Sequence, residues 1–264
     1  MDKQALSEKI YSSIRKSGKY SNVYEGTVRK IIDMMITRYG KEKEIEKNVK
    51  KKLHQIYGAY QLLVMNYELL VGDGGMLDVE KILSGHVSTA ERTGFYEEFY
   101  SRIFGVLGSD RKFKIYDAAC GFNPFSAGYF KDRVEVYHCS DIDVVLNDNL
   151  NRFFRDAGLV NFSSSNKDLT VDQINFADYD VVLLFKTLSC IERQEKGSAA
   201  LILKNALAAK NVVVSFPSKS IGGREKGMAE NYAVFLDGLI EGLELIKIDL
   251  TFPNEMVYIL SKSV

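Results

Sequence analysis

The chain has 264 residues, of which 46% are hydrophobic and 27% charged, and its formal net charge at pH 7 is zero. The apolar share supports a buried core and excludes a largely disordered chain, and the length suits one large domain or two modest ones. Because no run reaches the roughly 18 apolar residues of a membrane helix, and the first thirty residues carry charges throughout, we expect neither a membrane span nor a secretion signal. Three cysteines without a C-x-x-C pair argue against disulfides and a zinc site, so we expect a reducing cytoplasm and no bound metal.

The N-terminal part of the chain predicts a group of basic helices. Up to about residue 105 there is no proline, and apolar residues recur at helical spacing over 31–36 and 53–64. Residues 1–60 contain fourteen Lys and Arg against seven Asp and Glu, a net charge of +7, which leaves −7 for the rest of the chain. This charge favours contact with a polyanion, but a solvated Lys/Glu-rich helix at 41–52 would produce the same excess.

From about residue 113 the pattern changes to short apolar runs that alternate with helices. Four runs, rich in Val and bounded by Asp, Asn or Gly, are typical of strands buried on both faces, at 114–121, 134–141, 179–185 and 211–216. The intervening helical patterns predict a parallel sheet with right-handed crossovers. Two last strands flank Pro253-Asn254 and must pair as an antiparallel hairpin at the edge of the sheet.

This order of elements resembles the class I methyltransferase core. We therefore expect an α/β fold, with a Rossmann-like sheet that ends in an antiparallel hairpin and is preceded by an N-terminal helical region. The domain boundaries that follow are 1–105 for the helical, basic region and 106–264 for the methyltransferase core.

The ends of the first two predicted strands are candidates for a ligand site, because open α/β sheets bind ligands at the carboxyl ends of their strands. Gly121 belongs to a turn of small residues that lets the backbone approach a ligand closely. Asp141 lies twenty residues later, about the spacing at which an acidic side chain reaches the two hydroxyls of a ribose. The alternatives are an ordinary strand-to-loop turn at Gly121 and a helix N-cap role for Asp141, which is also open to Asp143.

Two later features belong to the same edge of the predicted sheet. Asp168 follows a poorly defined third strand and is placed to accept a hydrogen bond from an adenine amino group, although a surface aspartate there is equally typical. The loop over 215–228 contains three glycines and three cations within ten residues. This combination suits a flexible loop that holds phosphates.

Several motifs resemble those of the aminoglycoside-resistance 16S rRNA (guanine-N7) methyltransferases. They occur in the family's order: GHVSTAER at 85–92, ACGFNP at 119–124, YHCSDID at 137–143, FKTLSCIE at 185–192, FPSKSIGGR at 216–224 with KGM at 226–228, and PNE at 253–255. The resemblance implies methyl transfer from S-adenosyl-L-methionine to N7 of guanine 1405 (bacterial numbering) in the 30S subunit. It also implies 16S rRNA as the partner of the N-terminal region and resistance to aminoglycosides. We further expect a monomer located in the cytoplasm.

The resemblance also implies which residues bind the cofactor. Arg92 would hold the methionine carboxylate, and Gly121 would lie beneath the cofactor. Asp141 would bind the ribose, and Asp168 would approach the adenine.

Lys186, Arg224 and Glu255 fall where the family places residues of the target site, and they form the expected catalytic set. Guanine N7 carries a free lone pair, so catalysis needs positioning of the base rather than a general base. Lys186 would donate to O6 of the guanine, and Arg224 would bind a neighbouring phosphate or stack on the base. Glu255 would stabilise the cationic product ring or anchor the basic loop.

Other interpretations remain open at this stage. Ala118-Ala119 stands where the family often has a glycine, and Phe122 is bulkier than the common leucine, which leaves room for another target base. A methyltransferase of the same core acting on a small molecule would work without RNA, and a non-catalytic RNA-binding module would bind no cofactor. His86, Cys120 and Cys190 fit structural roles, the cysteines as small core residues.

Overall fold

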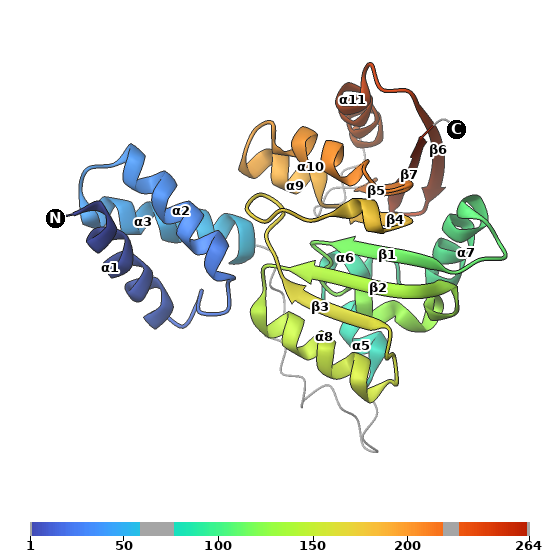
Figure 1. The fold of residues 1–264 in the computed structure, drawn as a ribbon, viewed down its shortest axis with the longest axis horizontal. Coiled ribbons are helices and arrows are strands. Elements are labelled where there is room, and N and C mark those ends of the chain that lie inside the picture. The colour runs from blue at the N-terminus through green and yellow to red at the C-terminus, as the bar shows by residue number, and fades with distance from the viewer. Residues whose placement is uncertain (1, 59–76, 219–226, 263–264) are drawn as a thin grey trace.

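The computed structural model describes residues 2–58, 77–218 and 227–262 (Figure 1). Its strands form one seven-stranded sheet in the order β3-β2-β1-β4-β5-β7-β6. In chain order the strands are β1 (Phe113–Ala118), β2 (Val134–Asp141), β3 (Phe162–Asn166), β4 (Val181–Phe185), β5 (Asn211–Pro217), β6 (Leu245–Phe252) and β7 (Glu255–Lys262).

The direction of the strands confirms the fold expected from the sequence. The first five strands pair in parallel, whereas β7 is antiparallel to both β5 and β6. Because only Pro253 and Asn254 separate β6 from β7, the chain can only turn back on itself there. The resulting hairpin forms the edge of the sheet next to β5.

Helices cover both faces of this sheet (Figure 1). On one face pack α5 (Val79–Ser84), α7 (Tyr96–Leu107) and α8 (Val144–Asp156), and on the other α9 (Leu188–Gln194), α10 (Ser198–Ala206) and α11 (Met228–Ile240). The central strands read as continuous apolar runs because alternate side chains enter the two cores. In β4, Val181 and Leu183 join the first core, and Val182 and Leu184 join the second. Shorter helical turns are α6 (Val87–Ala90), η2 (Asn123–Tyr129), η3 (Lys131–Arg133) and η4 (Phe176–Asp178).

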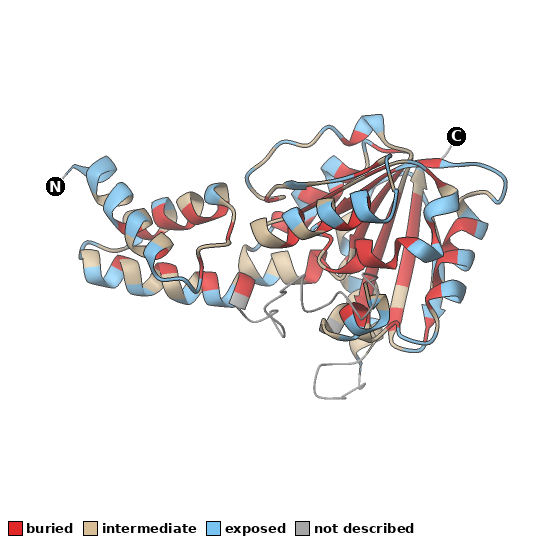
Figure 2. Cartoon of the chain, turned by 90° about the horizontal axis from the view of Figure 1, so that it is seen from below, coloured by how far each residue is buried: buried red, intermediate tan, exposed pale blue. Residues whose placement is uncertain are grey.

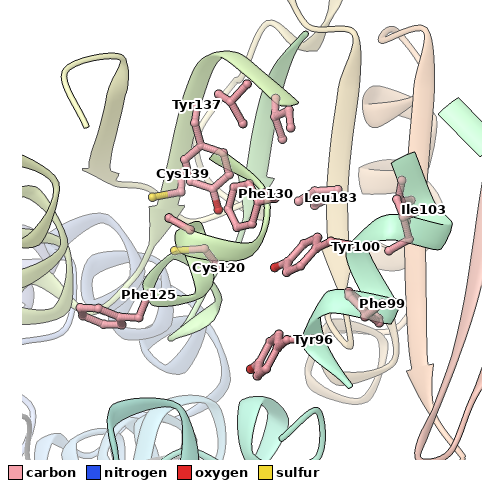
Figure 3. Packing of buried hydrophobic residues seen from close by; sticks show 14 of the residues in the cluster. Tyr96, Phe99, Tyr100, Ile103, Cys120, Phe125, Phe130, Tyr137, Cys139 and Leu183 are labelled. Atoms are coloured by element: carbon pink, nitrogen blue, oxygen red, sulfur yellow. The ribbon is translucent and has the colours of Figure 1, made fainter. Parts of the chain in front are cut away.

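Aromatic side chains fill the core on the face of the sheet that α5, α7 and α8 cover, and they pack α7 against the sheet (Figure 3). The ring of Tyr100 in α7 lies 4.6 Å from that of Phe130, which in turn lies 5.4 Å from the ring of Tyr137 in β2. Phe99 and Ile103 of the same helix are also buried there. Although α5 and most of α7 fall within the range 1–105 expected for the N-terminal region, both helices pack against the sheet.

The first three helices and a π-helical turn form a separate helical unit, here called the N-terminal unit (residues 2–58; Figures 1 and 2). Its elements are α1 (Lys3–Lys16), α2 (Glu25–Arg38), α3 (Glu42–Leu53) and η1 (His54–Gly58). They enclose an apolar core of their own, with Ile14, Ile32 and Val49 fully buried. The helix expected over 31–36 is confirmed, and that over 53–64 is described only as far as residue 58. Within the described ranges, no helix combines the length and apolarity needed to cross a membrane.

Candidate active site

A cavity of about 640 Å³ opens at the carboxyl end of the parallel strands, between the sheet domain and the N-terminal unit. Its volume lies in the range of roughly 300–1,000 Å³ that is typical of small-molecule sites. The loops that follow β1, β2, β3 and β4 supply one side of the wall, and α2 and η1 supply part of the other. The wall brings together five of the residues predicted from the sequence: Arg92, Gly121, Asp141, Asp168 and Lys186.

The loop after β1 turns sharply at the cavity wall. Gly121 has a φ of 49° and Ala119 a φ of 53°, so both residues adopt the left-handed conformation. Glycine does so freely, whereas an alanine pays roughly 1–2 kcal/mol. The Gly121 N–H donates to Asp141 Oδ2 at 3.0 Å, which ties the loop to the end of β2.

Asp141 lies on the cavity wall at the end of β2. Its Oδ1 accepts a hydrogen bond from the Asp143 N–H at 3.0 Å. Burial raises the pKa of Asp141 to about 6, although hydrogen bonds from the backbone of Asp143 and Gly121 oppose this shift. The helix-capping alternative applies to Asp143 instead, because its carboxylate accepts from the Leu146 N–H at 3.1 Å and caps α8. The Asp141 carboxylate is thus fixed by backbone donors while it faces the cavity.

Asp168 lies at the adjacent edge of the cavity and is 9% exposed. Its Oδ1 accepts from both the N–H and the hydroxyl of Thr170, at 2.8 and 2.6 Å. Its Oδ2 accepts from the hydroxyl of Thr27, at 2.6 Å, on helix α2 of the N-terminal unit. Both carboxylate oxygens are therefore held by protein donors, one of which comes from the other part of the molecule.

Arg92 is a buried cation in the wall of the cavity, with 2% of its surface exposed. Its Nε and Nη2 donate to the two carboxylate oxygens of Glu255 at 2.7 and 2.6 Å, and its Nη1 donates to Asn123 at 2.7 Å. The guanidinium carbon lies 4.4 Å from the ring centroids of both Phe99 and Phe185. These bonds use three of its five N–H groups. Burial opposes its charge, but Glu255 raises the pKa of Arg92 overall.

Lys186 and Glu255 extend the network of ion pairs that begins at Arg92. Lys186 directly follows β4 with a left-handed φ of 56°. Its Nζ donates to the Ser88 carbonyl at 3.1 Å and to the Glu91 carboxylate, and it lies 3.5 Å from Glu255 Oε2. Glu255 is fully buried, which opposes its charge, but Arg92 and Lys186 lower the pKa of Glu255. Arg92, Glu255, Lys186 and Glu91 thus form one charge network. Arg92, Lys186 and Glu91 line the cavity, and Glu255 is buried behind them.

The remaining predicted residue, Arg224, lies outside the described residues, as does most of the basic loop (219–226). The residues on either side of this loop are described. Pro217 and Met228 both line the cavity, and the Ser218 N–H donates to the Asn254 carbonyl at 3.0 Å. The described residues on both sides of this loop therefore lie at the cavity. Glu255, which was expected to stabilise the product ring or to anchor the loop, contacts Arg92 and Lys186.

His86 and Cys120 pack within the site, whereas Cys190, also expected to be a core residue, is only half-buried at the cavity. The Nδ1 atom of His86 lies 2.8 Å from the Ser88 hydroxyl, and its ring lies 4.9 Å from that of Phe122. Burial, helped by the charge of Lys186, lowers the pKa of His86 to about 4, so the ring is neutral at pH 7. Cys120 is buried and burial raises the pKa of its thiol, which excludes a reactive thiolate there.

Asp117 in β1 is a further buried carboxyl, to which the sequence assigned no role. Its Oδ2 accepts from the Tyr137 hydroxyl at 2.5 Å and from the Asn123 amide at 2.7 Å. Its Oδ1 has no hydrogen-bond partner among the described residues. Burial raises the pKa of Asp117 to about 7, because few donors compensate for the lost hydration of the charged form.

We expect the wild-type protein to gain stability relative to Asp117→Asn as the pH falls from 8 to 5. Asp117 binds its proton near pH 7 in the folded state but only near pH 4 in the unfolded chain, so protonation favours folding within this window. Urea unfolding of both proteins across the window measures the difference, and Asp178→Asn, at an exposed aspartate, is the control. A difference in unfolding free energy that does not change with pH would contradict the raised pKa.

Sequence reasoning missed three cavity residues that bind predicted site residues: Thr27, Glu91 and Asn123. Glu91 and Asn123 lie inside the motifs at 85–92 and 119–124, so their motif membership was a usable signal. Thr27 lies 141 residues away from its partner Asp168, and nothing in its sequence surroundings indicates this contact.

The residues of this cavity fit S-adenosyl-L-methionine, the cofactor implied by the sequence motifs. Asp141 presents a fixed carboxylate of the kind that accepts the two hydroxyls of a ribose. Arg92 retains two N–H groups beyond its three hydrogen bonds to described residues, enough for a carboxylate. A Cβ atom built on Gly121 would lie 3.8 Å from His86 Cε1, which is an ordinary contact, so glycine is favoured here by its left-handed φ of 49° rather than by lack of space.

Comparison with known proteins gives an independent result. A family model described as "Ribosomal RNA methyltransferase (FmrO)" matches residues 16–259. A 16S rRNA (guanine(1405)-N(7))-methyltransferase from Proteus mirabilis is 34% identical over 97% of both chains. The enzyme of the same name from Micromonospora echinospora is 31% identical, over 97% of this chain and 96% of that protein.

Solved structures agree with these matches. The crystal structure of the 16S rRNA methyltransferase RmtF in complex with S-adenosyl-L-homocysteine has a TM-score of 0.81 and 28% identity, and the match covers 100% of both chains. The 16S rRNA methylase RmtB follows with a TM-score of 0.80 and 27% identity, covering 97% of this chain and 98% of that one. The chain therefore belongs to the ribosomal RNA methyltransferase (FmrO) family.

Proposed function

We propose that this protein transfers a methyl group from S-adenosyl-L-methionine to N7 of guanine 1405 of 16S rRNA in the 30S subunit, and thereby confers resistance to aminoglycosides. The observation that carries the proposal is the near full-length similarity to enzymes named for this reaction, together with a cavity that suits the cofactor. We further propose that it acts as a monomer in the cytoplasm.

The cofactor supplies an electrophilic methyl group, and the chain supplies the groups that hold it. Asp141 accepts the ribose hydroxyls, and its ties to the backbone of Gly121 and Asp143 keep its oxygens in place. Asp168 accepts from the adenine amino group. Arg92 donates its two remaining N–H groups to the methionine carboxylate, held in orientation by Glu255 and Asn123.

On the acceptor side, the residues of the chain orient the guanine. N7 has no proton to remove, so the site needs no general base. The lowered pKa of His86, about 4, makes its ring a weak base, and Cys120 is buried. The side chain of Lys186 is 11% exposed and lines the cavity. Its ammonium group donates a hydrogen bond to O6 of the guanine, which is an acceptor. Glu255 acts through Arg92 and Lys186, and Arg224 on the basic loop contacts the RNA backbone or the base.

Methylation of purified 30S subunits with labelled S-adenosyl-L-methionine, followed by mass mapping of 16S rRNA, tests this proposal. We expect one added methyl group at N7 of guanine 1405. Label at another nucleotide would show a different target base, and methylation of a small molecule without RNA would show a different substrate class. Binding of 30S subunits without any methyl transfer would mark the protein as a non-catalytic RNA-binding module.

We propose that the N-terminal unit binds the phosphates of this RNA. Lys43, Lys47 and Lys51 occupy positions i, i+4 and i+8 of α3, and all three side chains are exposed. Residues at this spacing lie along one face of a helix, so they form a stripe of positive charge, here called the α3 lysine stripe. Such a stripe is suited to a polyanion, and it gives the positive charge of residues 1–60 a defined location.

Replacing the α3 lysine stripe by glutamine (Lys43→Gln, Lys47→Gln, Lys51→Gln) is expected to weaken binding to 30S subunits at least about 10-fold. The slope of log K against log salt should fall by about 2 to 3, because roughly one counterion is released for each phosphate contacted. The control is the triple variant Lys112→Gln, Lys131→Gln, Lys204→Gln, which removes the same charge from exposed positions of the sheet domain. Equal losses of 30S binding in the two triple variants would mean that the α3 lysine stripe is a solvated helix face without a specific contact to RNA.

A further inference from the structure

Hydroxyl groups of the N-terminal unit bind the carboxylates at the ends of β2 and β3. Thr27 donates to Asp168 Oδ2 at 2.6 Å, and Tyr57 donates to Asp143 Oδ2 at 2.9 Å. Tyr24 donates to Asp172 Oδ1 at 3.2 Å. All three acceptors lie in the two loops that form the Asp141 and Asp168 edge of the cavity. The N-terminal unit thus reaches the sheet domain at the proposed cofactor site.

Backbone contacts fix the same junction. The Tyr24 N–H donates to the Ile142 carbonyl at 2.7 Å, and the Val144 N–H donates to the Asn22 carbonyl at 2.8 Å. The side chain of Ile142, the residue after Asp141, packs against the apolar core of the N-terminal unit. A displacement of this unit would therefore move the segment that carries Asp141.

The bond from Thr27 to Asp168 is the most shielded of the side-chain contacts. Thr27 is 2% and Asp168 9% exposed, and both line the cavity. The Oδ1 atom of Asp168 is held from within its own loop by Thr170, whereas Oδ2 is held from the N-terminal unit by Thr27. Without the Thr27 hydroxyl, Oδ1 keeps its two hydrogen bonds from Thr170, whereas Oδ2 loses the bond that fixes its position.

We propose that Thr27 is a positioning residue for the cofactor, and that the N-terminal unit helps to bind the cofactor by holding the loops that carry Asp141 and Asp168. Thr27 sets the orientation in which the Asp168 carboxylate meets the adenine amino group. By thermodynamic reciprocity, a cofactor that binds across this junction tightens the attachment of the N-terminal unit by the same free energy. The unit proposed to bind RNA is therefore held more firmly when the cofactor is present. This inference rests on the proposed function, because it assigns the cavity to S-adenosyl-L-methionine.

Calorimetric titration with S-adenosyl-L-homocysteine tests the role of Thr27. We expect Thr27→Val, which keeps the shape but removes the hydroxyl, to raise the Kd about 10-fold, and Thr27→Ser to bind like the wild type. The matched control is Thr37→Val on the same helix, where the hydroxyl donates only to the Met34 carbonyl at 2.8 Å on the exposed side. In methylation assays Thr27→Val should raise the KM for the cofactor and leave kcat within a factor of two, a split that a general loss of folded protein would not produce.

The outcomes separate this inference from the proposed function. A wild-type protein that binds no S-adenosyl-L-homocysteine would overturn the assignment of the cavity itself. Wild-type binding with equal or tighter binding by Thr27→Val would overturn the role of Thr27 and leave the proposed function standing. Hydrogen exchange of the wild type gives a second readout that needs no variant: residues 22–34 should exchange more slowly when the ligand is bound, and an unchanged rate would contradict the coupling.

Discussion

Replacement of Asp141 by alanine is expected to abolish binding of S-adenosyl-L-homocysteine, with a Kd raised at least about 100-fold. Hydrogen bonds to a charged group contribute roughly 1.5–3 kcal/mol each, and this carboxylate is proposed to accept two of them from the ribose. The variant also removes the acceptor of the Gly121 and Asp143 N–H groups, so the loop after β1 loses its tie to β2. Isothermal titration calorimetry measures the effect directly.

Asp148→Ala is the control for this experiment. Asp148 lies on α8, seven positions further along the chain, and its side chain is exposed. It should bind the ligand like the wild type, and thermal unfolding of both variants separates lost binding from lost folding. Binding by a folded Asp141→Ala protein that matches the wild type would remove Asp141 from the site.

Glu255→Gln is expected to destabilise the protein by about 3–5 kcal/mol, the largest effect on folding that we predict. Among the described residues, the substitution leaves only Glu91 to balance the charges of Arg92 and Lys186. Arg92 is 2% exposed, so water cannot compensate for the missing carboxylate. Urea unfolding of the variant and the wild type gives the difference in unfolding free energy.

A surface ion pair provides the matched comparison for Glu255. Glu98 pairs with Arg102 at 3.2 Å, and both side chains are 40% or more exposed. Glu98→Gln should therefore cost less than about 1 kcal/mol. A loss in Glu255→Gln as small as that in Glu98→Gln would mean that the buried charge network is not held together by Glu255.

The sheet was predictable wherever a strand is apolar or a connection is short. β2 begins and ends where its apolar run does, and Pro253-Asn254 allowed only a hairpin. β3 was poorly defined in the sequence because its residues, FSSSN, include a single apolar side chain, and the strand lies at the edge of the sheet. Such a strand is specified by its neighbour β2 rather than by its own composition.

The division of the chain was harder to derive, because helices of both domains follow one another without a composition change. α7 shows the same helical periodicity as α2, yet its aromatic residues pack on the sheet, whereas the aliphatic residues of α2 pack in the core of the N-terminal unit. Which surface an amphipathic helix covers depends on its partners, and these are far away in the sequence.

The residues of the site also differ in how far the sequence predicts them. Gly121 and Asp141 were predictable because they sit at strand ends with a meaningful spacing, and the structure joins them by a hydrogen bond at 3.0 Å. The partners of Arg92 were not, since Glu255 lies 163 residues away and reaches it only through the pairing of β5 with β7. Long-range pairs of this kind, including Thr27 with Asp168, follow from topology and not from local pattern.

A crystal structure of the protein with S-adenosyl-L-homocysteine bound is the most direct measurement of whether this cavity is the methyl-donor site. The ribose hydroxyls should lie within hydrogen-bond distance of the Asp141 carboxylate, the adenine beside Asp168, and the amino-acid carboxylate on Arg92. A ligand bound elsewhere on the molecule, or a cavity filled by the protein's own side chains under saturating ligand, would contradict this placement and with it the proposed reaction.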